Sequence, residues 1–313
     1  MNPPHPTVIV TGANNRRKGK MDIRIGLIVS TLSAVVLFAP VPAAAEAYMP
    51  DVKTNLIVFP VTVDGKVLQG VGRLQVPLAP EHGVPAVVIV HGTGGMDAKG
   101  PMYAQDLNAI GIATLEIDLW GPRGLAGGWD GRPKHVNETL PDAFAALHFL
   151  AGHPRIDNAR IGIMGFSWGG VVSMLTATEP YVRALSPDGV QFAAHAPFYP
   201  ICFAYNRIPG YEFKLLTGAP VAIFTGADDK YDADPGMCPQ LVAGLPVDFR
   251  AKVRVTVYPG AEHGFNNLDQ PRTYLDPYHF QGKGGIGAST PNPVAREASR
   301  EAVVTFFRES LAR

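Results

Sequence analysis

Apolar and polar positions change their rhythm along the chain, and each rhythm predicts a different kind of element. Residues 86–90 form an unbroken apolar run, as expected for a strand buried on both faces. Apolar runs and amphipathic stretches then alternate up to the C-terminus. The expected strands lie at 112–117, within 160–166, and at 190–194, 220–224 and 253–258, and the expected helices at 102–110, 140–150, 171–178, 238–244 and 292–312. This alternation indicates a mostly parallel, doubly wound sheet with helices on both faces.

The segment before this alternating region has a different pattern. Residues 55–60 and 70–77 are expected to be antiparallel strands, with the turn-like pair Asp64-Gly65 between them. At the other end of the chain, the apolar positions of the last helix repeat with helical spacing. The side that we expect it to bury carries Val294, Ala298, Ala302, Val303 and Phe306.

Three long irregular stretches, 120–139, 199–218 and 264–291, follow predicted strands. In open α/β sheets the ligand site lies outside the carboxyl ends of the strands, so these loops are expected to surround it. The stretch 199–218 is too short for a substantial lid. We therefore expect an accessible site and no large cap domain.

The first 47 residues resemble a leader with a signal peptide. A basic lead at 16–20 precedes a mainly apolar run at 25–40, and small residues suited to signal peptidase follow. Cleavage after Ala45 or Ala47 fits this pattern. The apolar run is short for a membrane span, so the transmembrane alternative is weaker. We expect an exported, periplasmic or secreted protein without a stable membrane anchor after processing.

The rest of the chain, 48–313, shows no internal repeat and no linker, so we expect a single domain. Met21 is an alternative start to Met1, because the basic lead lies far into the chain. Apolar residues make up 46% and charged residues 17%, which suits a sizeable core. Lys+Arg and Asp+Glu both number 27, and this balance gives no reason to expect a nucleic acid as partner.

The first candidate for chemistry is the G-x-S-x-G pattern of Gly165-Phe-Ser167-Trp-Gly169. A serine is exposed at the top of a sheet only by a very tight turn, and the residues two before and two after it must then be glycine. The pattern is weak by itself, but an apolar strand precedes it and a helical stretch follows. The plainer interpretation is a strand–turn–helix in which Ser167 only caps the helix.

A nucleophilic serine needs a histidine base and a carboxylate that orients it. In this type of sheet the expected chain order is Ser, then Asp or Glu, then His, each after a strand. His263 follows the strand at 253–258 and is the one histidine in the right place, although it could also be an ordinary loop residue. The acid is less defined, because the loop after 220–224 contains four candidates. They are Asp228, Asp229, Asp232 and Asp234.

An oxyanion hole requires two backbone N–H donors aimed at the developing charge. Trp168, directly after the serine, is expected to supply one. The glycine-rich loop His91-Gly-Thr-Gly-Gly95 is expected to supply the other through Thr93, with Gly94 as the next choice, and the ring of His91 to brace this loop. No metal-ligand spacing is present, so we expect neither a metal nor another cofactor.

With these motifs together, residues 84–312 resemble an α/β-hydrolase of the dienelactone hydrolase-like group. The motifs are His91-Gly-Thr-Gly-Gly95, Asp118-Leu-Trp-Gly-Pro-Arg-Gly124, Met164-Gly-Phe-Ser-Trp-Gly-Gly170, Phe198-Tyr-Pro-x-Cys202, Gly226-x-x-Asp229 followed by Cys238, and Ala261-x-His-Gly-Phe265. The resemblance implies the α/β-hydrolase fold with antiparallel N-terminal strands. It also implies Ser167 as nucleophile, Asp229 as orienting acid and His263 as base.

One departure and two open points follow from the resemblance. Dienelactone hydrolases proper carry cysteine where this chain has Ser167, which makes dienelactone itself a doubtful substrate. Arg123 either binds a substrate carboxylate or braces the site through a salt bridge. Cys202 and Cys238 follow neighbouring strands at one sheet edge, so a disulfide is possible, and two buried free thiols are the alternative.

The sequence thus predicts a serine hydrolase that cleaves small-molecule carboxylic esters through an acyl-enzyme. Lactone hydrolysis of the dienelactone hydrolase type is one alternative. A peptidase on the same triad is another, although it would usually need an extra domain for which the chain has no room. A non-catalytic binding protein with this fold is the third, and the intact Ser, Asp and His argue against it.

Overall fold

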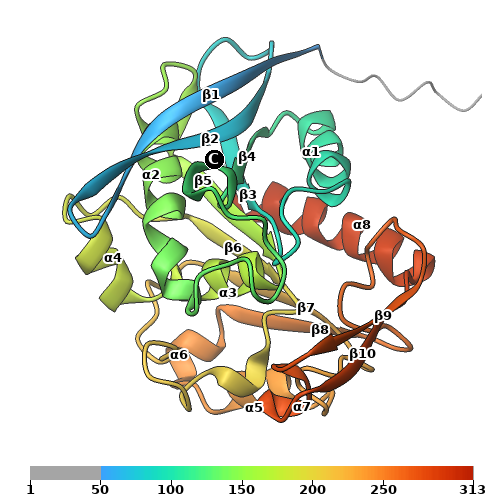
Figure 1. The fold of residues 1–313 in the computed structure, drawn as a ribbon. Coiled ribbons are helices and arrows are strands. Elements are labelled where there is room, and N and C mark those ends of the chain that lie inside the picture. The colour runs from blue at the N-terminus through green and yellow to red at the C-terminus, as the bar shows by residue number, and fades with distance from the viewer. Residues whose placement is uncertain (1–50, 313) are drawn as a thin grey trace, which may run out of the picture. The chain divides into compact units, whose positions relative to one another are not determined.

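A computed structural model describes residues 51–312, and the predicted leader with its cleavage site lies outside them. Eight strands form one sheet in the order β1-β2-β4-β3-β5-β6-β7-β8 (Figure 1). The strands are β1 (Val52–Val63), β2 (Lys66–Pro77), β3 (Val84–Val90), β4 (Ala113–Asp118), β5 (Ile156–Phe166), β6 (Ala194–Phe198), β7 (Val221–Gly226) and β8 (Val253–Tyr258). β1 and β2 are antiparallel, β2 is antiparallel to β4, and all other neighbours are parallel. The predicted fold class is confirmed.

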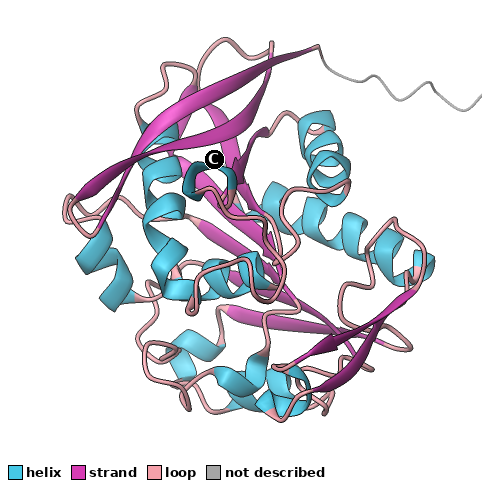
Figure 2. Cartoon of the chain, viewed as in Figure 1, coloured by secondary structure: helices cyan, strands magenta, loops and turns pink. Residues whose placement is uncertain are grey.

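Helices cover both faces of this sheet (Figure 2). The helices are α1 (Lys99–Ala109), α2 (Leu140–Ala151), α3 (Trp168–Leu175), α4 (Glu179–Leu185), α5 (Met237–Ala243), α6 (Val247–Arg250), α7 (His279–Gly282) and α8 (Pro293–Ser310), with short 3-10 turns η1 (Gly121–Arg123), η2 (Val136–Thr139) and η3 (Cys202–Ala204). The core on one face includes α2 and α3, and the core on the other includes α1 and α8. None of the helices among the described residues combines the length and apolarity needed to cross a bilayer.

The apolar run of β3 serves both cores at once. Val88 and Val90 belong to the core with α2 and α3, whereas Val87 and Ile89 belong to the core with α1 and α8. Successive side chains of a strand point to opposite faces, so a strand between two helical layers must be apolar at every position.

The strand predicted at 190–194 is wrong, because β6 begins only at Ala194. His195 therefore lies near the start of a strand and not at its end. Its ring is fully buried and Nδ1 donates to the carbonyl oxygen of Ser173 at 3.0 Å. Burial lowers its pKa to about 4, so the ring is neutral in the core. The strand β6 contains His195 and Pro197, so its sequence lacks the continuous apolar run that would have predicted its bounds.

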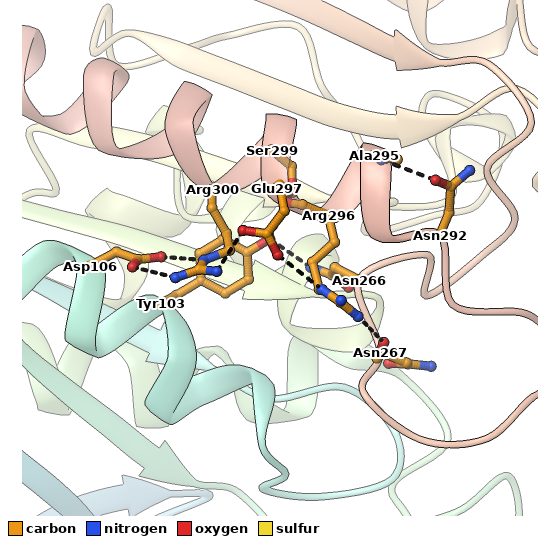
Figure 3. Close-up of polar contacts among 10 residues, drawn as sticks. All are labelled: Tyr103, Asp106, Asn266, Asn267, Asn292, Ala295, Arg296, Glu297, Ser299 and Arg300. Atoms are coloured by element: carbon orange, nitrogen blue, oxygen red, sulfur yellow. Dashed lines mark hydrogen bonds and ion pairs between the residues drawn. The ribbon is translucent and has the colours of Figure 1, made fainter. Parts of the chain in front are cut away.

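The predicted buried side of α8 is confirmed in part: Val303 and Phe306 are buried and Ala302 is partly buried, whereas Val294 and Ala298 are exposed. The buried residues of α8 are Ala295, Ser299, Val303, Phe306 and Phe307. Val294 is 81% exposed, and Ala298 also faces solvent. The hydroxyl of Ser299 lies 2.8 Å from that of Tyr103 in α1 (Figure 3). Because the buried Ser299 has a hydrogen-bond partner, a prediction from apolar residues alone omits Ser299 and includes the exposed Val294 and Ala298.

The stretch 264–291, expected to be irregular, contains a small antiparallel hairpin. β9 (Arg272–Asp276) pairs with β10 (Gly285–Ser289), and α7 lies between them. The hairpin forms a sheet of its own, separate from the main one. Both strands are short and carry polar or glycine residues at many positions, so they lack the apolar pattern of a buried strand.

Candidate active site

Ser167 lies in a sharp turn between β5 and α3. Its backbone has a φ of 51° and a ψ of −106°, a left-handed conformation that a serine adopts only when its surroundings impose it. A Cβ on Gly165 would overlap the carbonyl oxygen of Gly169, and one on Gly169 would overlap that of Val90. The Ser167 amide donates to the Phe198 carbonyl at 3.0 Å. Gly165 is therefore required because the two ends of the turn approach each other closely, and Gly169 because the turn approaches β3.

Three of the predicted side chains come together at the carboxyl ends of β5, β7 and β8. The Nε2 atom of His263 lies 2.8 Å from the Oγ of Ser167. Its Nδ1 lies 2.8 Å from Oδ2 of Asp229, which is 4% exposed. In the neutral ring, Nδ1–H donates to the carboxylate, and Nε2 is then free to accept the serine proton.

The structure separates Asp229 from its three neighbours in the acid loop. Asp228 is exposed, and Asp234 accepts a hydrogen bond from the amide of Gly236 at 2.7 Å. Asp232 is buried and accepts from two amides of the loop after β6, at 3.0 and 2.8 Å. Burial and, to a smaller extent, the nearby carboxylate of Asp229 together raise its pKa to about 7. Among the four, only Asp229 makes a hydrogen bond with His263 within the described part of the chain.

The two predicted oxyanion donors lie beside Ser167. Trp168 is the first residue of α3, and its indole donates to the Thr139 hydroxyl at 3.0 Å, which fixes the start of the helix. Thr93 lines the same cavities as Ser167, and its carbonyl accepts from the Trp120 indole at 3.1 Å. Between residues 51 and 312, neither the Trp168 nor the Thr93 amide has a protein acceptor. Both are therefore available to a substrate oxygen.

The loop that carries Thr93 is held as the sequence predicts. Nε2 of His91 accepts from the Leu119 amide at 2.9 Å, and Nδ1 lies 2.7 Å from the Gly92 carbonyl. The histidine is 3% exposed and does not reach Ser167 through any hydrogen bond. Gly94 has no atom within 4 Å of where a Cβ would stand, so this part of the loop faces open space beside the site.

Two cavities meet at Ser167. One has a volume of about 430 Å³ and the other about 320 Å³, and they share Thr93, Ser167, Tyr231 and Asp276. The larger cavity is lined by the loop after β6, and the smaller one is lined by residues of both β9 and β10. The site is therefore open on two sides of the serine.

Arg123 does not line either cavity. Its Nη1 and Nη2 atoms lie 2.6 and 2.7 Å from the two carboxylate oxygens of Asp142, at the start of α2. Both side chains are largely buried, and burial raises the pKa of Asp142. Of the two roles considered for Arg123, the geometry corresponds to the salt bridge, and the expectation of direct substrate binding is not supported.

Sequence reasoning missed Arg132, Tyr231, Asp276 and Tyr278. The Arg132 guanidinium carbon lies 4.4 Å from the centre of the Trp168 ring and 4.9 Å from that of Tyr278. The Tyr231 hydroxyl donates to Asp276 at 2.6 Å, and its ring lies 4.2 Å from the His263 ring. Three of the four belong to the loops at 120–139 and 264–291, which were expected to surround the site without individual residues being named.

Cys202 and Cys238 lie with their sulfur atoms at bonding distance. They connect the turn after β6 to α5, and the acid loop runs between β7 and α5. Oxidation to a disulfide at this position stays a prediction that a chemical test must decide.

Comparisons with known proteins show the family of the chain and agree with its fold. The model of the dienelactone hydrolase family matches residues 72–311. An uncharacterized protein of Mycobacterium tuberculosis is 28% identical over 199 residues, which are 61% of this chain and 67% of that protein. Among solved structures, Thermogutta terrifontis esterase 2 phosphorylated by paraoxon has a TM-score of 0.58 at 18% identity, covering 84% of this chain and 95% of its own. The dienelactone hydrolase-like promiscuous phosphotriesterase P91 from metagenomic libraries has a TM-score of 0.55 at 20% identity, covering 82% and 98%.

Proposed function

Because the chain belongs to the dienelactone hydrolase family, we propose that it is a serine hydrolase that cleaves carboxylic esters through an acyl-enzyme. The observation that carries the proposal is the relay from Asp229 through His263 to Ser167, with both hydrogen bonds at 2.8 Å. A buried carboxylate that holds a histidine next to a strained, cavity-lining serine is the arrangement that activates a hydroxyl for acyl transfer.

The first half of the proposed reaction forms the acyl-enzyme. The Oγ of Ser167 attacks the ester carbonyl carbon while Nε2 of His263 takes the hydroxyl proton. The amides of Trp168 and Thr93 donate to the carbonyl oxygen as it becomes negative, and the N-terminus of α3 adds its positive end. His263 then gives its proton to the departing alcohol oxygen, and the bond between that oxygen and the carbonyl carbon breaks.

The second half uses the same groups on water. His263 takes a proton from a water molecule, which attacks the acyl carbon, and the proton then returns to the Oγ of Ser167 as the acid leaves. Asp229 keeps its charge throughout, holds the ring in one orientation and stabilises the imidazolium that forms in both halves. In a lactone the departing alcohol would remain attached to the acid, and the steps would be the same.

The test is hydrolysis of p-nitrophenyl acetate, butyrate and octanoate by the full chain and by Ser167→Ala. Ser310→Ala, at the end of α8, is the matched control. We expect activity in the wild type and the control and its loss in Ser167→Ala. Equal rates in all three proteins would exclude Ser167 as the nucleophile.

Paraoxon offers a second, covalent test, because a structurally similar esterase is phosphorylated by it. We expect it to inactivate the chain and to modify the peptide that contains Ser167, as found by mass spectrometry. A non-catalytic binding protein would not be modified.

Export remains part of the proposal, and sequencing the N-terminus of the protein recovered outside the cytoplasm would test cleavage after Ala45 or Ala47.

A further inference from the structure

Only one of the two cavities at Ser167 is lined by the base His263. Given the proposed function, this difference indicates which cavity holds the acyl part of the substrate and which holds the alcohol part. The smaller cavity is lined by His263, and the larger one is not. In the acylation step His263 must protonate the departing alcohol oxygen, so that oxygen has to lie on the side of the histidine. The smaller cavity is therefore the alcohol cavity, and the larger one is the acyl cavity.

The acyl cavity has mainly apolar and aromatic walls. Its lining includes Val171, Ile201, Phe203, Ile208 and Tyr211, and its charged residues are Arg132, Lys134 and Asp276. Its volume of about 430 Å³ corresponds to roughly 14 groups of the size of a water molecule, at about 30 Å³ each. A bulky apolar acyl group can fill this cavity, so that its apolar surface is removed from water, whereas an acetyl group would leave most of the cavity empty.

The alcohol cavity is more polar than the acyl cavity, and its charges are balanced. Its charged residues are two acids, Asp97 and Asp276, and two bases, Lys99 and Arg272. Lys99, only 8% exposed, pairs with Asp97 and also donates to Asn267 Oδ1 at 2.5 Å. Because the charges cancel, the cavity favours neither an anionic nor a cationic alcohol.

Part of the polar wall of this cavity is held in place before any ligand arrives. The side-chain Nδ2 of Asn267 donates to the Ser289 hydroxyl at 2.7 Å. The backbone carbonyl of Asn267 accepts a hydrogen bond from Arg296 of α8 at 3.1 Å (Figure 3). Asn267 thus connects α1, β10 and α8 through Lys99, Ser289 and Arg296. Fixed hydrogen-bonding groups in a cavity recognise hydroxyl groups at low entropic cost.

The mouth of the alcohol cavity adds a flat apolar surface. Trp129 lines this cavity and is 54% exposed, so its ring is available to a ligand. An aromatic ring beside hydrogen-bonding groups of balanced charge suits a compound that has a carbon face and several hydroxyls. We propose that the substrates are esters of a bulky apolar acid with a neutral, hydroxyl-rich alcohol, such as a polyol or a sugar.

The test compares four esters that combine two acids with two alcohols: glyceryl and ethyl acetate, and glyceryl and ethyl octanoate. For the wild type we expect octanoate to be preferred over acetate. We also expect kcat/KM to be ~10-fold higher for the glyceryl than for the ethyl ester of one acid, as two hydrogen bonds of moderate strength imply. If the wild type preferred ethyl over glyceryl esters, the inference that the alcohol part of the substrate is rich in hydroxyl groups would be wrong.

Variants on the two sides test the orientation. Ile208→Trp narrows the acyl cavity. It is expected to lower kcat/KM for octanoate esters relative to acetate esters, and to do so equally for the glyceryl and the ethyl esters. Trp129→Ala and Arg272→Ala are expected to reduce the glyceryl preference, for both acids alike. All three positions are exposed, Ile208 by 38%, so the variants should fold, and thermal melting checks this.

The matched control is Val247→Ala in α6, at a 72% exposed position outside both cavities, which should keep every ratio. If Ile208→Trp changed the alcohol preference and Trp129→Ala the acid preference, the orientation would be reversed and the inference wrong. A failure of the proposed function looks different, because Ser167→Ala would then hydrolyse all four esters as fast as the wild type.

Discussion

Replacing Arg123 by methionine is expected to destabilise the fold and to leave catalysis in place. The Arg123 and Asp142 side chains are 11% and 3% exposed, and two hydrogen bonds of 2.6 and 2.7 Å join them. Removing one partner of such a buried pair leaves an uncompensated charge and costs about 3–5 kcal/mol. At about 2–4 °C per kcal/mol, the melting temperature should fall by ~6–20 °C.

The loss of stability in Arg123→Met should depend on pH with a defined sign. Burial raises the pKa of Asp142 above its ordinary value of 3.8, and Arg123 opposes this rise. Without Arg123 the pKa rises further. A carboxyl whose folded pKa lies above its unfolded pKa loses stability as the pH rises from the unfolded value through the folded one, at about 1.4 kcal/mol per unit of pKa difference. The deficit should therefore be larger at pH 8 than at pH 5.

Urea unfolding of the wild type and Arg123→Met at both pH values measures this deficit. The double variant Arg123→Met with Asp142→Leu removes both charges and should recover much of the lost stability. The KM for p-nitrophenyl acetate should stay within about 2-fold of the wild type. A variant as stable as the wild type, with a KM raised at least ~10-fold for an ester that carries a carboxylate, would refute the reasoning and make Arg123 a substrate-binding residue.

Three further predictions concern the relay, the turn and the cysteines. Asp229→Asn should lower kcat about 10⁴-fold at unchanged melting temperature, because the ring loses the partner that sets its tautomer, and a loss below 10-fold would contradict the proposed relay. Gly169→Ala should lower the melting temperature strongly because its Cβ would overlap a β3 carbonyl, whereas Gly94→Ala, which meets no atom within 4 Å, should melt like the wild type. Mass spectrometry after alkylation should find Cys202 and Cys238 protected until reduction, and replacing both by serine should cost about 4 kcal/mol of unfolding free energy for a separation of 36 residues.

The proximity of Ser167, Asp229 and His263 could be predicted from the sequence because each of them follows a strand that has a strong local pattern. The apolar run of β3 and the G-x-S-x-G turn after β5 are short-range features, and in a parallel sheet the chain order then places the acid and the base at one edge. The remaining ambiguity was among the neighbouring aspartates. The residues alone do not distinguish Asp229 from Asp232, because the two differ in their hydrogen-bond partners. The partner of Asp229 is His263 in the loop after β8, whereas the partners of Asp232 are amides in the loop after β6.

The two arginines of the loop at 120–139 show where local patterns stop being informative. Arg123 pairs with Asp142 of α2, whereas Arg132 lies against Trp168 and Tyr278 in the acyl cavity. Both residues lie in a polar stretch rich in glycine, and nothing near either of them in the chain distinguishes their roles. The difference is set by partners up to 146 residues away, from Arg132 to Tyr278, which only the folded chain brings into contact.

The same reasoning explains why the substrate is harder to infer than the reaction. The chemistry depends on strand ends that the sheet places by its topology, and any chain with this pattern of strands repeats them. The walls of the cavities depend on contacts such as the hydrogen bond from Tyr231 to Asp276, which docks the β9–β10 hairpin beside His263. These contacts join loops that have weak patterns, so a few substitutions there can change the acid or the alcohol without touching the relay. Exchanging residues of the hairpin or of the 120–139 loop should therefore alter kcat/KM ratios between esters well before it alters the dependence of activity on Ser167.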